Sequence, residues 1–384
     1  MSTRTTKSLW ICAAAAFAIG GVAVLFRLFT GHRYADYGSY MPWGLWVSVY
    51  VYLVWLEVGT VLAFTGLVHV FGLKQLEPVR KHVLLLAGVV LLGALVQIGL
   101  DLGHLGRAWR PFLTPNFRSP MAWMIWLHVL YLAVLAGELV IGVRRAGDPE
   151  AERRVRSLSV LNIPIGLALV SVVASVFGVS AAQPLWSGIA LPLFFLLSSL
   201  VVGTAMVALV HAISAPEARP PEHAETQRLL GRVVLGLVLF GAFSVIVNMA
   251  TVLYPGGTAS ADSVRAVLWG RHAWSLWLVH GVLGIAVPVA LLARRDPSPR
   301  ARSLAMGLVV LGFVPVPVNL IVPALAHREF ATLLEAFNGP GLESGYFPTA
   351  LEWLVSLWVV SAVLLAMLAG ERWLGRRPAS AMGH

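Results

Sequence analysis

The 384-residue chain has the composition of a membrane protein: hydrophobic residues make up 58% and charged residues 12%, against about 25% charged residues in soluble domains. This composition excludes a soluble enzyme of two or three domains. The formal net charge is +10. Because the basic residues lie in short loops between apolar runs, membrane topology accounts for them better than nucleic-acid binding does.

Ten apolar stretches have, or nearly have, the length of about 20 residues that a transmembrane helix needs. In chain order they cover residues 9–28, 43–70, 83–102, 121–143, 158–181, 191–213, 230–251, 274–293, 304–323 and 351–374. These runs are too long and too continuously apolar for a membrane β-barrel. The first run has no clean small-residue cleavage site after it, so we expect an uncleaved helix rather than a signal peptide. The predicted fold class is all-α, a polytopic membrane protein with ten transmembrane helices.

An even number of helices places both termini on one side of the membrane. With these spans, 20 of the 28 basic residues fall on the side of the termini and eight on the other. Basic residues accumulate in cytoplasmic loops. We therefore expect a protein of the bacterial cytoplasmic (inner) membrane with both termini in the cytoplasm.

The loops on the two sides differ in composition. The loops at 144–156 and 214–227 are short charged tethers, whereas those at 34–46, 104–123, 254–270 and 327–348 are rich in aromatic residues, Pro and Gly. Loops of the second kind usually fold onto something. We expect the outer face to dock a partner, with Arg107, Arg110, Arg271 and Tyr346 as candidate docking residues.

Polar and ionisable side chains inside the spans are expensive and are candidate functional residues. The rise of 1.5 Å per residue puts one group of them in the outer half of the membrane: Gln97, Asp101, His128, Asn248, His280 and Asn319. Arg107, Arg118, Arg271 and His272 lie just above this group. Glu57 and Glu138 lie deeper and are candidates for a proton route toward the cytoplasm.

Such a group suits a quinone headgroup, which needs hydrogen-bond partners at two oxygens and a carboxylate or imidazole to exchange protons. Asp101 and His128 are the candidates for that exchange. Two structural alternatives stay open. A single Asn or Gln is more often a contact between helices, and Asp101 could simply pair with Arg107 or Arg118.

Two other function classes also stay open. Bis-histidine haem needs two imidazoles that face each other, and His128 with His280 is the one pair at matching depth. A proton-coupled transporter would need broken helices in both halves of the chain, and Pro315 with Pro317 marks the only good candidate. The single cysteine, Cys12, excludes a cysteine-ligated cluster within this chain.

Several motifs resemble those of the NrfD/PsrC family, the polysulfide-reductase-type, quinone-interacting membrane subunits. Residues 41–46 read Met-Pro-Trp-Gly-Leu-Trp, and residues 101–107 read Asp-Leu-Gly-His-Leu-Gly-Arg. Residues 116–123 read Asn-Phe-Arg-Ser-Pro-Met-Ala-Trp, and residues 345–349, Gly-Tyr-Phe-Pro-Thr, precede Glu352. The last segment is similar to the ten-helix branch that includes hydrogenase-type membrane subunits.

This resemblance implies a single membrane domain built as two four-helix bundles, 1–145 and 155–295, plus two additional helices in 300–376. It implies a quinone site near the outer face, for menaquinone or ubiquinone. We expect the polar residues of the outer half to form this site: Gln97, Asp101, Arg118, His128, Asn248 and His280. It also implies that this chain binds no haem or iron–sulfur cluster. The implied partners are a ferredoxin-like iron–sulfur subunit and a catalytic subunit, either a molybdopterin enzyme, a hydrogenase or a multihaem cytochrome.

The sequence therefore predicts the membrane anchor and quinone-reactive subunit of a respiratory oxidoreductase complex. It would pass electrons between the quinone pool and the iron–sulfur partner and would not be catalytic alone. Proton translocation would be an additional activity.

Overall fold

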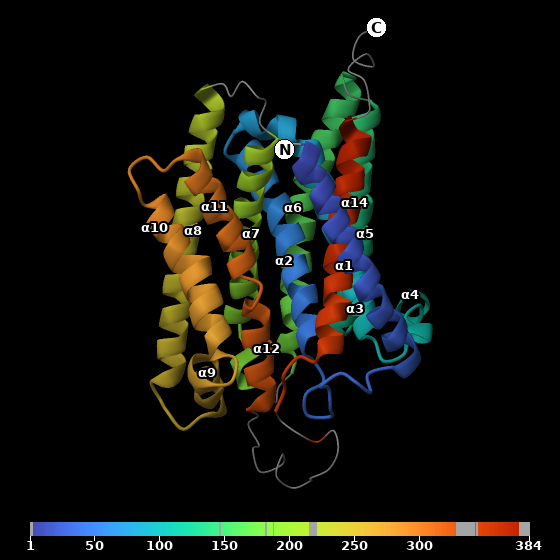
Figure 1. The fold of residues 1–384 in the computed structure, drawn as a ribbon, viewed down its shortest axis with the longest axis vertical. Helices are drawn as coiled ribbons and strands as arrows, with labels where there is room; N and C mark the ends of the chain where they lie inside the picture. Colours follow the sequence, from blue (N-terminus) through green and yellow to red (C-terminus); the bar gives the residue numbers. More distant parts are fainter. Residues whose placement is uncertain are drawn as a thin grey trace.

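The computed structural model describes residues 3–145, 147–180, 183–186, 188–214, 221–327, 342 and 345–375. These residues form a layered array of helices (Figure 1), and none of them is in a β-strand. Ten helical segments are long and apolar enough to cross a membrane. The prediction of an all-α, ten-helix integral membrane protein is therefore confirmed. Arg219, Arg328, Arg376 and Arg377 of the charge sorting, and residue 181 of the fifth predicted span, lie outside the described residues.

The observed helices extend the predicted apolar runs by a few residues at most ends. The first five spans are α1 (Thr3–Thr30), α2 (Leu45–Thr65) with η1 (Gly66–Val70), η2 (Lys74–Val79) with α3 (Arg80–Asp101), α5 (Pro120–Arg144) and α6 (Pro149–Gly178). The other five are α7 (Ala190–Ile213), α8 (Pro221–Leu253), η5 (Ser275–Ala286) with α10 (Val287–Leu292), α11 (Pro299–Gly312) with α12 (Val316–Ala326), and α14 (Ala350–Gly375). The connections contain η3 (Leu105–Arg107), α4 (Arg110–Leu113), η4 (Pro184–Trp186) and α9 (Ala259–Trp269).

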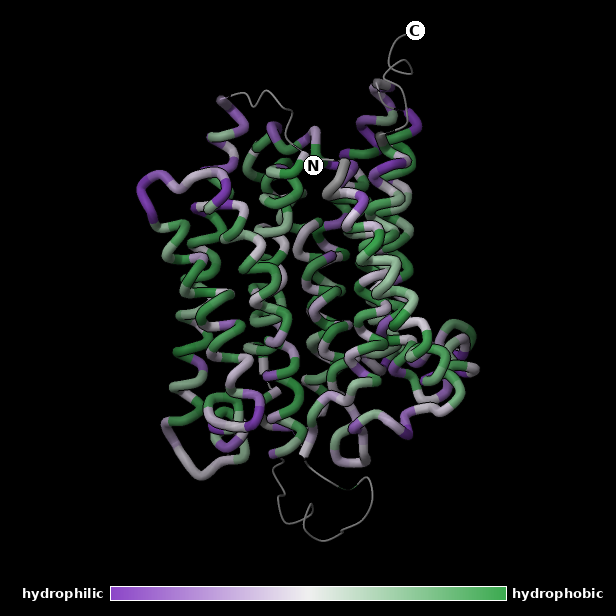
Figure 2. Tube along the Cα trace, in the orientation of Figure 1, coloured by the Kyte–Doolittle hydropathy of each residue, from purple (hydrophilic) through white to green (hydrophobic). Residues whose placement is uncertain are grey.

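The N-terminal end of α1 and the C-terminal end of α14 lie at the same end of the array, as an even number of spans requires (Figure 1). The opposite end carries α4 and α9 and is called the outer end below. Hydropathy follows this arrangement, because the middle of the array is apolar and hydrophilic residues gather at its two ends (Figure 2).

Helix α2 is the centre of the molecule. All of its residues except Val49 are buried, and it packs against α3, α6, α7, α12 and α14. Gly59 and Gly203 bring α2 and α7 into backbone contact, since a Cβ built on Gly203 would lie 1.9 Å from the Gly59 carbonyl carbon. Small residues allow this close approach between membrane helices. The division into two four-helix bundles stays a prediction.

The ninth span is broken, as Pro315 and Pro317 predicted. Helix α11 ends at Gly312 and α12 begins at Val316, because proline has no N–H to donate within a helix. The Tyr52 hydroxyl on α2 donates to the Val310 carbonyl over 2.6 Å just before the break. The break is therefore held against the central helix.

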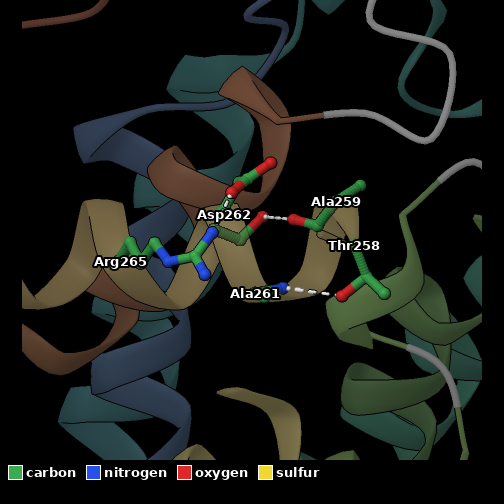
Figure 3. Close-up of polar contacts among 6 residues, drawn as sticks. Thr258, Ala259, Ala261, Asp262 and Arg265 are labelled. Carbon is green, nitrogen blue, oxygen red and sulfur yellow. Dashed lines mark hydrogen bonds and ion pairs between the residues drawn. The ribbon is translucent and has the colours of Figure 1, made fainter. Parts of the chain in front are cut away.

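The predicted outer loop at 254–270 contains the short helix α9. Its N-cap is Thr258, whose hydroxyl accepts a hydrogen bond from the Ala261 N–H over 3.1 Å. Asp262 and Arg265 form an ion pair at 2.7 Å one turn later (Figure 3). Ala261, Val264 and Val267 are buried, so the loop folds because one face of it can pack on the membrane domain.

Candidate functional site

The C-terminal end of α3 is capped by an arginine from another helix. Arg27 near the end of α1 is 2% exposed and donates from Nε to the Leu100 carbonyl over 2.9 Å and from Nη2 to the Leu102 carbonyl over 2.7 Å. Its guanidinium lies 5.7 Å from the centre of the Trp46 ring. A cation at this position satisfies carbonyls that have no helical partner and offsets the negative end of the helix dipole.

Asp101 is the last residue of α3 and meets the first outer loop. Its carboxylate accepts a hydrogen bond from the Tyr37 hydroxyl and interacts electrostatically with the Arg27 guanidinium. The oxygen Oδ1 is buried without a hydrogen-bond partner among the described residues. Arg27 therefore takes the place of Arg107 or Arg118, the partners that the sequence suggested, and both of those side chains are exposed.

Glu352 on α14 ties the outer segments together. Its carboxylate accepts hydrogen bonds from the Asp36 N–H over 3.0 Å, from the Thr349 N–H over 3.2 Å and from the Tyr346 hydroxyl. The Glu352 backbone carbonyl accepts from the Trp46 indole over 3.1 Å. We call Arg27, His32, Tyr37, Asp101, Tyr346 and Glu352 the outer polar cluster, because contacts link these side chains at the outer ends of α1, α2, α3 and α14. Arg27 Nη2 lies 3.3 Å from His32 Nε2, and the Tyr37 ring contacts the rings of His32 and Tyr346.

The Pro-Trp-Gly motif has a structural role at this cluster. A Cβ on Gly44 would lie 2.3 Å from the Tyr346 hydroxyl oxygen, so only glycine leaves room for the tyrosine ring. The Tyr346 hydroxyl accepts a hydrogen bond from the Leu45 N–H over 2.6 Å, which satisfies one of the free N–H groups in the first turn of α2. The Trp43 ring meets the Phe177 ring edge to face and contacts the Trp186 ring at a tilt.

Tyr346 differs from the sequence expectation of a docking residue. It is 2% exposed, and its backbone carbonyl lies 3.0 Å from His272 Nε2. The side chain is therefore an internal contact rather than part of a surface. Arg107, Arg110 and Arg271 are exposed, as docking residues must be.

A second layer of polar groups lies one helical turn below the cluster. Gln97 precedes Asp101 by four residues on the same face of α3, and its Nε2 donates to the Ser356 hydroxyl over 3.4 Å. The Gln97 oxygen Oε1 is buried without a partner among the described residues. Tyr50 follows Trp46 by four residues on α2, so the two layers share one face of that helix as well.

His128 on α5 belongs to this second layer. Its Nδ1 lies 2.7 Å from the Met124 carbonyl, and its Nε2 lies 3.5 Å from the Tyr50 hydroxyl. A carbonyl can only accept, so the Nδ1 atom carries the proton and Nε2 is left as an acceptor. The ring is 1% exposed.

The remaining members of the predicted group lie elsewhere. His280 contacts Phe313 and the Gly312 carbonyl near the broken helix, and Asn319 donates to the Ser275 hydroxyl over 3.0 Å. Asn248 is exposed on α8 and Arg118 is exposed before α5. Helices α5 and α10, the continuation of η5, lie at opposite sides of the array (Figure 1). His128 and His280 therefore do not face each other as a haem-ligand pair.

Two buried carboxyl groups extend from this layer toward the termini. Glu57 is 1% exposed, and both of its oxygens lack a partner among the described residues. Glu138 accepts a hydrogen bond from Asn162 over 2.8 Å. Tyr131 lies within electrostatic range of both carboxyl groups. Tyr50 and Glu57 share one face of α2, and His128, Tyr131 and Glu138 share one face of α5, so these side chains form one line along the two helices.

The Asn-Phe-Arg-Ser-Pro motif starts α5. Asn116 Oδ1 accepts from the Arg118 N–H over 3.2 Å, and the N-cap Ser119 accepts from the Met121 N–H over 3.3 Å. Pro120 occupies the first turn, where its missing N–H costs nothing. This motif therefore has a sufficient explanation as a helix start, whereas the exposed Arg118 side chain takes no part in the cap.

The surroundings at the outer end change the pKa values of three loop side chains, those of His32, Tyr37 and His272. Burial, reinforced by the Arg27 charge, lowers the pKa of His32. Burial, reinforced by the Asp101 charge, raises the pKa of Tyr37 well above its usual value. Burial, together with Arg271, lowers the pKa of His272. The two histidines are therefore neutral at pH 7, and the tyrosine keeps its proton.

Sequence reasoning finds Asp101 and its depth but misses most of its neighbours. From the sequence, Arg27 counts only among the basic residues that indicate the orientation in the membrane. An arginine in the last turn of an apolar helix is itself a sign of function. His32 and Tyr37 lie in a loop with no pattern that marks them. Among the described residues, no group of three or more His, Cys, Asp or Glu side chains is arranged to hold a metal ion.

The fold and the site define a class of protein: a polytopic helical membrane protein with a buried carboxylate–arginine–tyrosine site at one end of its helices. The profile of the family described as "Polysulphide reductase, NrfD" matches residues 35–329. The chain belongs to this family, as its motifs predicted.

Two relatives match over most of their length. The chain is 26% identical to a subunit of the selenate reductase of Mesobacillus selenatarsenatis, over 94% of this chain and 92% of the relative. It is 20% identical to the "Hdr-like menaquinol oxidoreductase integral membrane subunit" of Archaeoglobus fulgidus, over 86% of this chain and 84% of the relative. Both relatives are named as subunits of oxidoreductases, and both matches span most of this chain.

Proposed function

We propose that this chain is the quinone-reactive membrane subunit of a respiratory oxidoreductase complex, with its reaction site at the outer polar cluster. The observation that carries the proposal is Asp101, a carboxylate at the outer end of α3 with one buried oxygen that lacks a partner among the described residues. A relative that is named a menaquinol oxidoreductase subunit supports a quinone as the class of substrate, and we propose menaquinone or ubiquinone.

The residues present fit a quinone headgroup. The ring has two oxygens that need hydrogen-bond partners, and it supplies two-electron, two-proton redox chemistry when bound. Asp101 Oδ1 and Gln97 Oε1 are buried acceptor atoms without a partner among the described residues. His128 Nε2, an acceptor 3.5 Å from the Tyr50 hydroxyl, lies at a neighbouring depth. Acceptors of this kind suit the two hydroxyl groups of the reduced ring, the quinol. His280, Asn248 and Arg118 are not part of this proposal, because they lie in other parts of the fold.

Each residue has a distinct role in the proposal. Asp101 exchanges a proton with the substrate oxygen, and the nearby Arg27 offsets the cost of its negative charge. Tyr37 keeps its proton and holds the Asp101 carboxylate in place. His128, fixed by its bond to Met124, accepts a hydrogen bond at Nε2. Proton exchange by a positioned side chain contributes typically 10²- to 10⁴-fold to a rate.

Glu57, Tyr131 and Glu138 form the proposed proton route toward the side of the termini. A carboxyl group without a partner inside a membrane domain is best explained by a part in proton movement. Asn162 holds the Glu138 carboxyl over 2.8 Å at the far end of this line. Proton translocation coupled to quinone chemistry would use it.

The part of the outer end around η3 and α4 is the proposed docking surface for the redox partner. Arg107 and Arg110 lie exposed beside three exposed apolar side chains, which are Trp109, Leu113 and Phe117. Exposed apolar surface rimmed by charge is typical of protein interfaces. We propose a ferredoxin-like iron–sulfur subunit there, joined to a catalytic subunit such as a molybdopterin enzyme, a hydrogenase or a multihaem cytochrome. In this proposal the surface lies outside the cytoplasm at a bacterial inner membrane, with both termini inside.

The test is Asp101→Asn, with Asp262→Asn as the matched control. Asp262 is an aspartate of the outer end that pairs with Arg265 on α9, outside the proposed site. The assembled complex is purified and its oxidation of a short-chain quinol is followed with an artificial electron acceptor. We expect a loss of at least tenfold in Asp101→Asn and normal rates in the control. Normal turnover by assembled Asp101→Asn complex would remove the proposed role of Asp101.

A further inference from the structure

The end of the array that carries the termini has a concentration of arginines around a hollow. The hollow is lined by five arginines: Arg228 and Arg232 from α8, Arg294 and Arg295 from the connection after α10, and Arg302 from α11. The rest of the lining is Gly231, Leu292 and Pro297. We call it the arginine hollow. Figure 2 shows the hydrophilic stretch between α10 and α11 at this end.

Arg302 distinguishes this hollow from the general surplus of basic residues on the side of the termini. It is 5% exposed, and its Nε and Nη1 atoms are buried without a hydrogen-bond partner among the described residues. The Asp296 carboxylate approaches Nη1 only to 3.9 Å. A buried guanidinium with unused donors is costly, and exposed arginines placed around it add like-charge repulsion.

An anion in the hollow would relieve both costs. Guanidinium groups bind phosphate oxygens with two parallel hydrogen bonds, and no acidic side chain is part of the described lining. Arg302 also lines the adjoining hollow with His223 and Gln227, so its donors can be reached from this end of the molecule.

The surroundings indicate that the anion is attached to a lipid. The hollow lies near the start of α8, and the exposed side of α8 that follows carries Leu239, Phe240 and Phe243, each about half or more exposed. These side chains form an apolar track along which acyl chains can lie. Basic pockets between membrane helices on the cytoplasmic side are suited to anionic headgroups.

We propose that the arginine hollow binds the phosphate of an anionic phospholipid, such as phosphatidylglycerol or cardiolipin, in the leaflet on the side of the termini. Arg302 forms the floor of the site, and Arg294 with Arg295 closes over the phosphate from the α10–α11 connection. The lipid fills the gap between α8 and α11 and fixes the α10–α11 connection. This site is at the opposite end of the molecule from the outer polar cluster.

The test uses the full chain, with the subunits that purify with it, in a neutral detergent. Delipidated protein is titrated with phosphatidylglycerol, with phosphatidylcholine and with inorganic phosphate, and bound lipid and melting temperature are measured. The variant is Arg294→Gln/Arg295→Gln. The matched control is Arg144→Gln/Arg145→Gln. It removes two adjacent, exposed arginines where α5 ends, at the same end of the array as the arginine hollow.

We expect phosphatidylglycerol to bind and stabilise the wild type and the control, and phosphatidylcholine to do neither. Each arginine near a lipid phosphate contributes about 1 kcal/mol to binding, which is less than a tenfold change in affinity. The Arg294→Gln/Arg295→Gln variant should therefore bind about 10- to 30-fold more weakly. Arg302→Gln should abolish specific binding, and the exposed pair keeps the test valid where Arg302→Gln does not fold.

Two results would overturn the proposal. Equal losses in the variant and in the control pair would show that the lipid is attracted by charge in general and not by the hollow. Stabilisation by millimolar inorganic phosphate equal to that by phosphatidylglycerol would assign the site to a soluble phosphate compound instead of a lipid.

Discussion

A methyl group on Gly44 should disrupt the outer polar cluster without touching Asp101. The Cβ of Gly44→Ala would lie 2.3 Å from both the Tyr346 hydroxyl oxygen and ring carbon Cζ. Ordinary van der Waals contact begins at 3.4 Å, so the ring must move by about 1.1 Å. Tyr346 is 2% exposed, and a rigid ring in a packed site cannot make that shift alone.

The movement has a cost that follows from the two hydrogen bonds of the hydroxyl. Tyr346 accepts from the Leu45 N–H over 2.6 Å and donates to the Glu352 carboxylate. A buried group left without its partner costs about 1–3 kcal/mol, so losing both bonds costs about 2–6 kcal/mol. Whole-protein stabilities are about 5–15 kcal/mol, so this loss is large.

The assay is thermal unfolding of the purified complex, followed by tryptophan fluorescence, together with quinol turnover. We expect Gly44→Ala to lower the melting temperature by several degrees and to reduce turnover. Gly99→Ala is the control. Gly99 lies in the last turn of α3, also at the outer end, and a Cβ there meets nothing within 4 Å. A Gly44→Ala protein that melts and turns over like wild type would refute the packing argument.

Three further predictions concern other parts of the molecule. Gly203→Ala should force α2 and α7 apart, since its Cβ would lie 1.9 Å from the Gly59 carbonyl carbon. Overpacking costs typically about 1–3 kcal/mol, so the yield of monodisperse protein should fall. The control Gly88→Ala, whose Cβ meets nothing within 4 Å, should leave the yield unchanged. The protein should lose stability below about pH 6.5, because the pKa of His272 is lowered in the folded state and the unfolded chain therefore takes up the proton first. As the pH falls from about 7.5 to about 5.5, the melting temperature should fall less steeply in His272→Gln than in the wild type. An equal dependence of melting temperature on pH in both proteins would contradict this. Glu57→Gln should keep the melting temperature close to that of wild type but slow proton uptake from the side of the termini at least tenfold in vesicles, and normal uptake would remove Glu57 from the proposed route.

The ten spans could be predicted from the sequence because a bilayer imposes a length and a composition on each of them. Even the break in the ninth span was readable, since Pro315 and Pro317 cannot continue a helix. The short helix α9 was not foreseen. Its 11 residues carry no membrane-length signal, and its three buried apolar side chains gain a partner only when the rest of the fold is in place.

The candidate site could be predicted only in part. The position of a residue in the sequence gives its depth in the membrane, but it does not give the direction in which its side chain points around the helix axis. Asp101 and Asn248 have similar predicted depths, yet Asp101 meets Arg27 and Tyr37 while Asn248 is exposed on α8. The rotation of each helix is set by packing against its neighbours, which no single helix encodes. Arg27 and Glu352 are 325 residues apart in the sequence and were brought into one cluster by the packing of α14 against both α1 and α3.

A ten-helix membrane protein of the NrfD family with ionisable groups at defined depths can be recognised from the amino-acid sequence, because composition, span length and local motifs are properties of short segments. Which of those groups meet depends on the packing of the helices. It joined Asp101 to Arg27 and Tyr37, buried Tyr346 against Glu352, separated His128 from His280, and gathered five arginines around one hollow. Those outcomes depend on which helices share a face, and that is settled by the packing of side chains from distant parts of the chain.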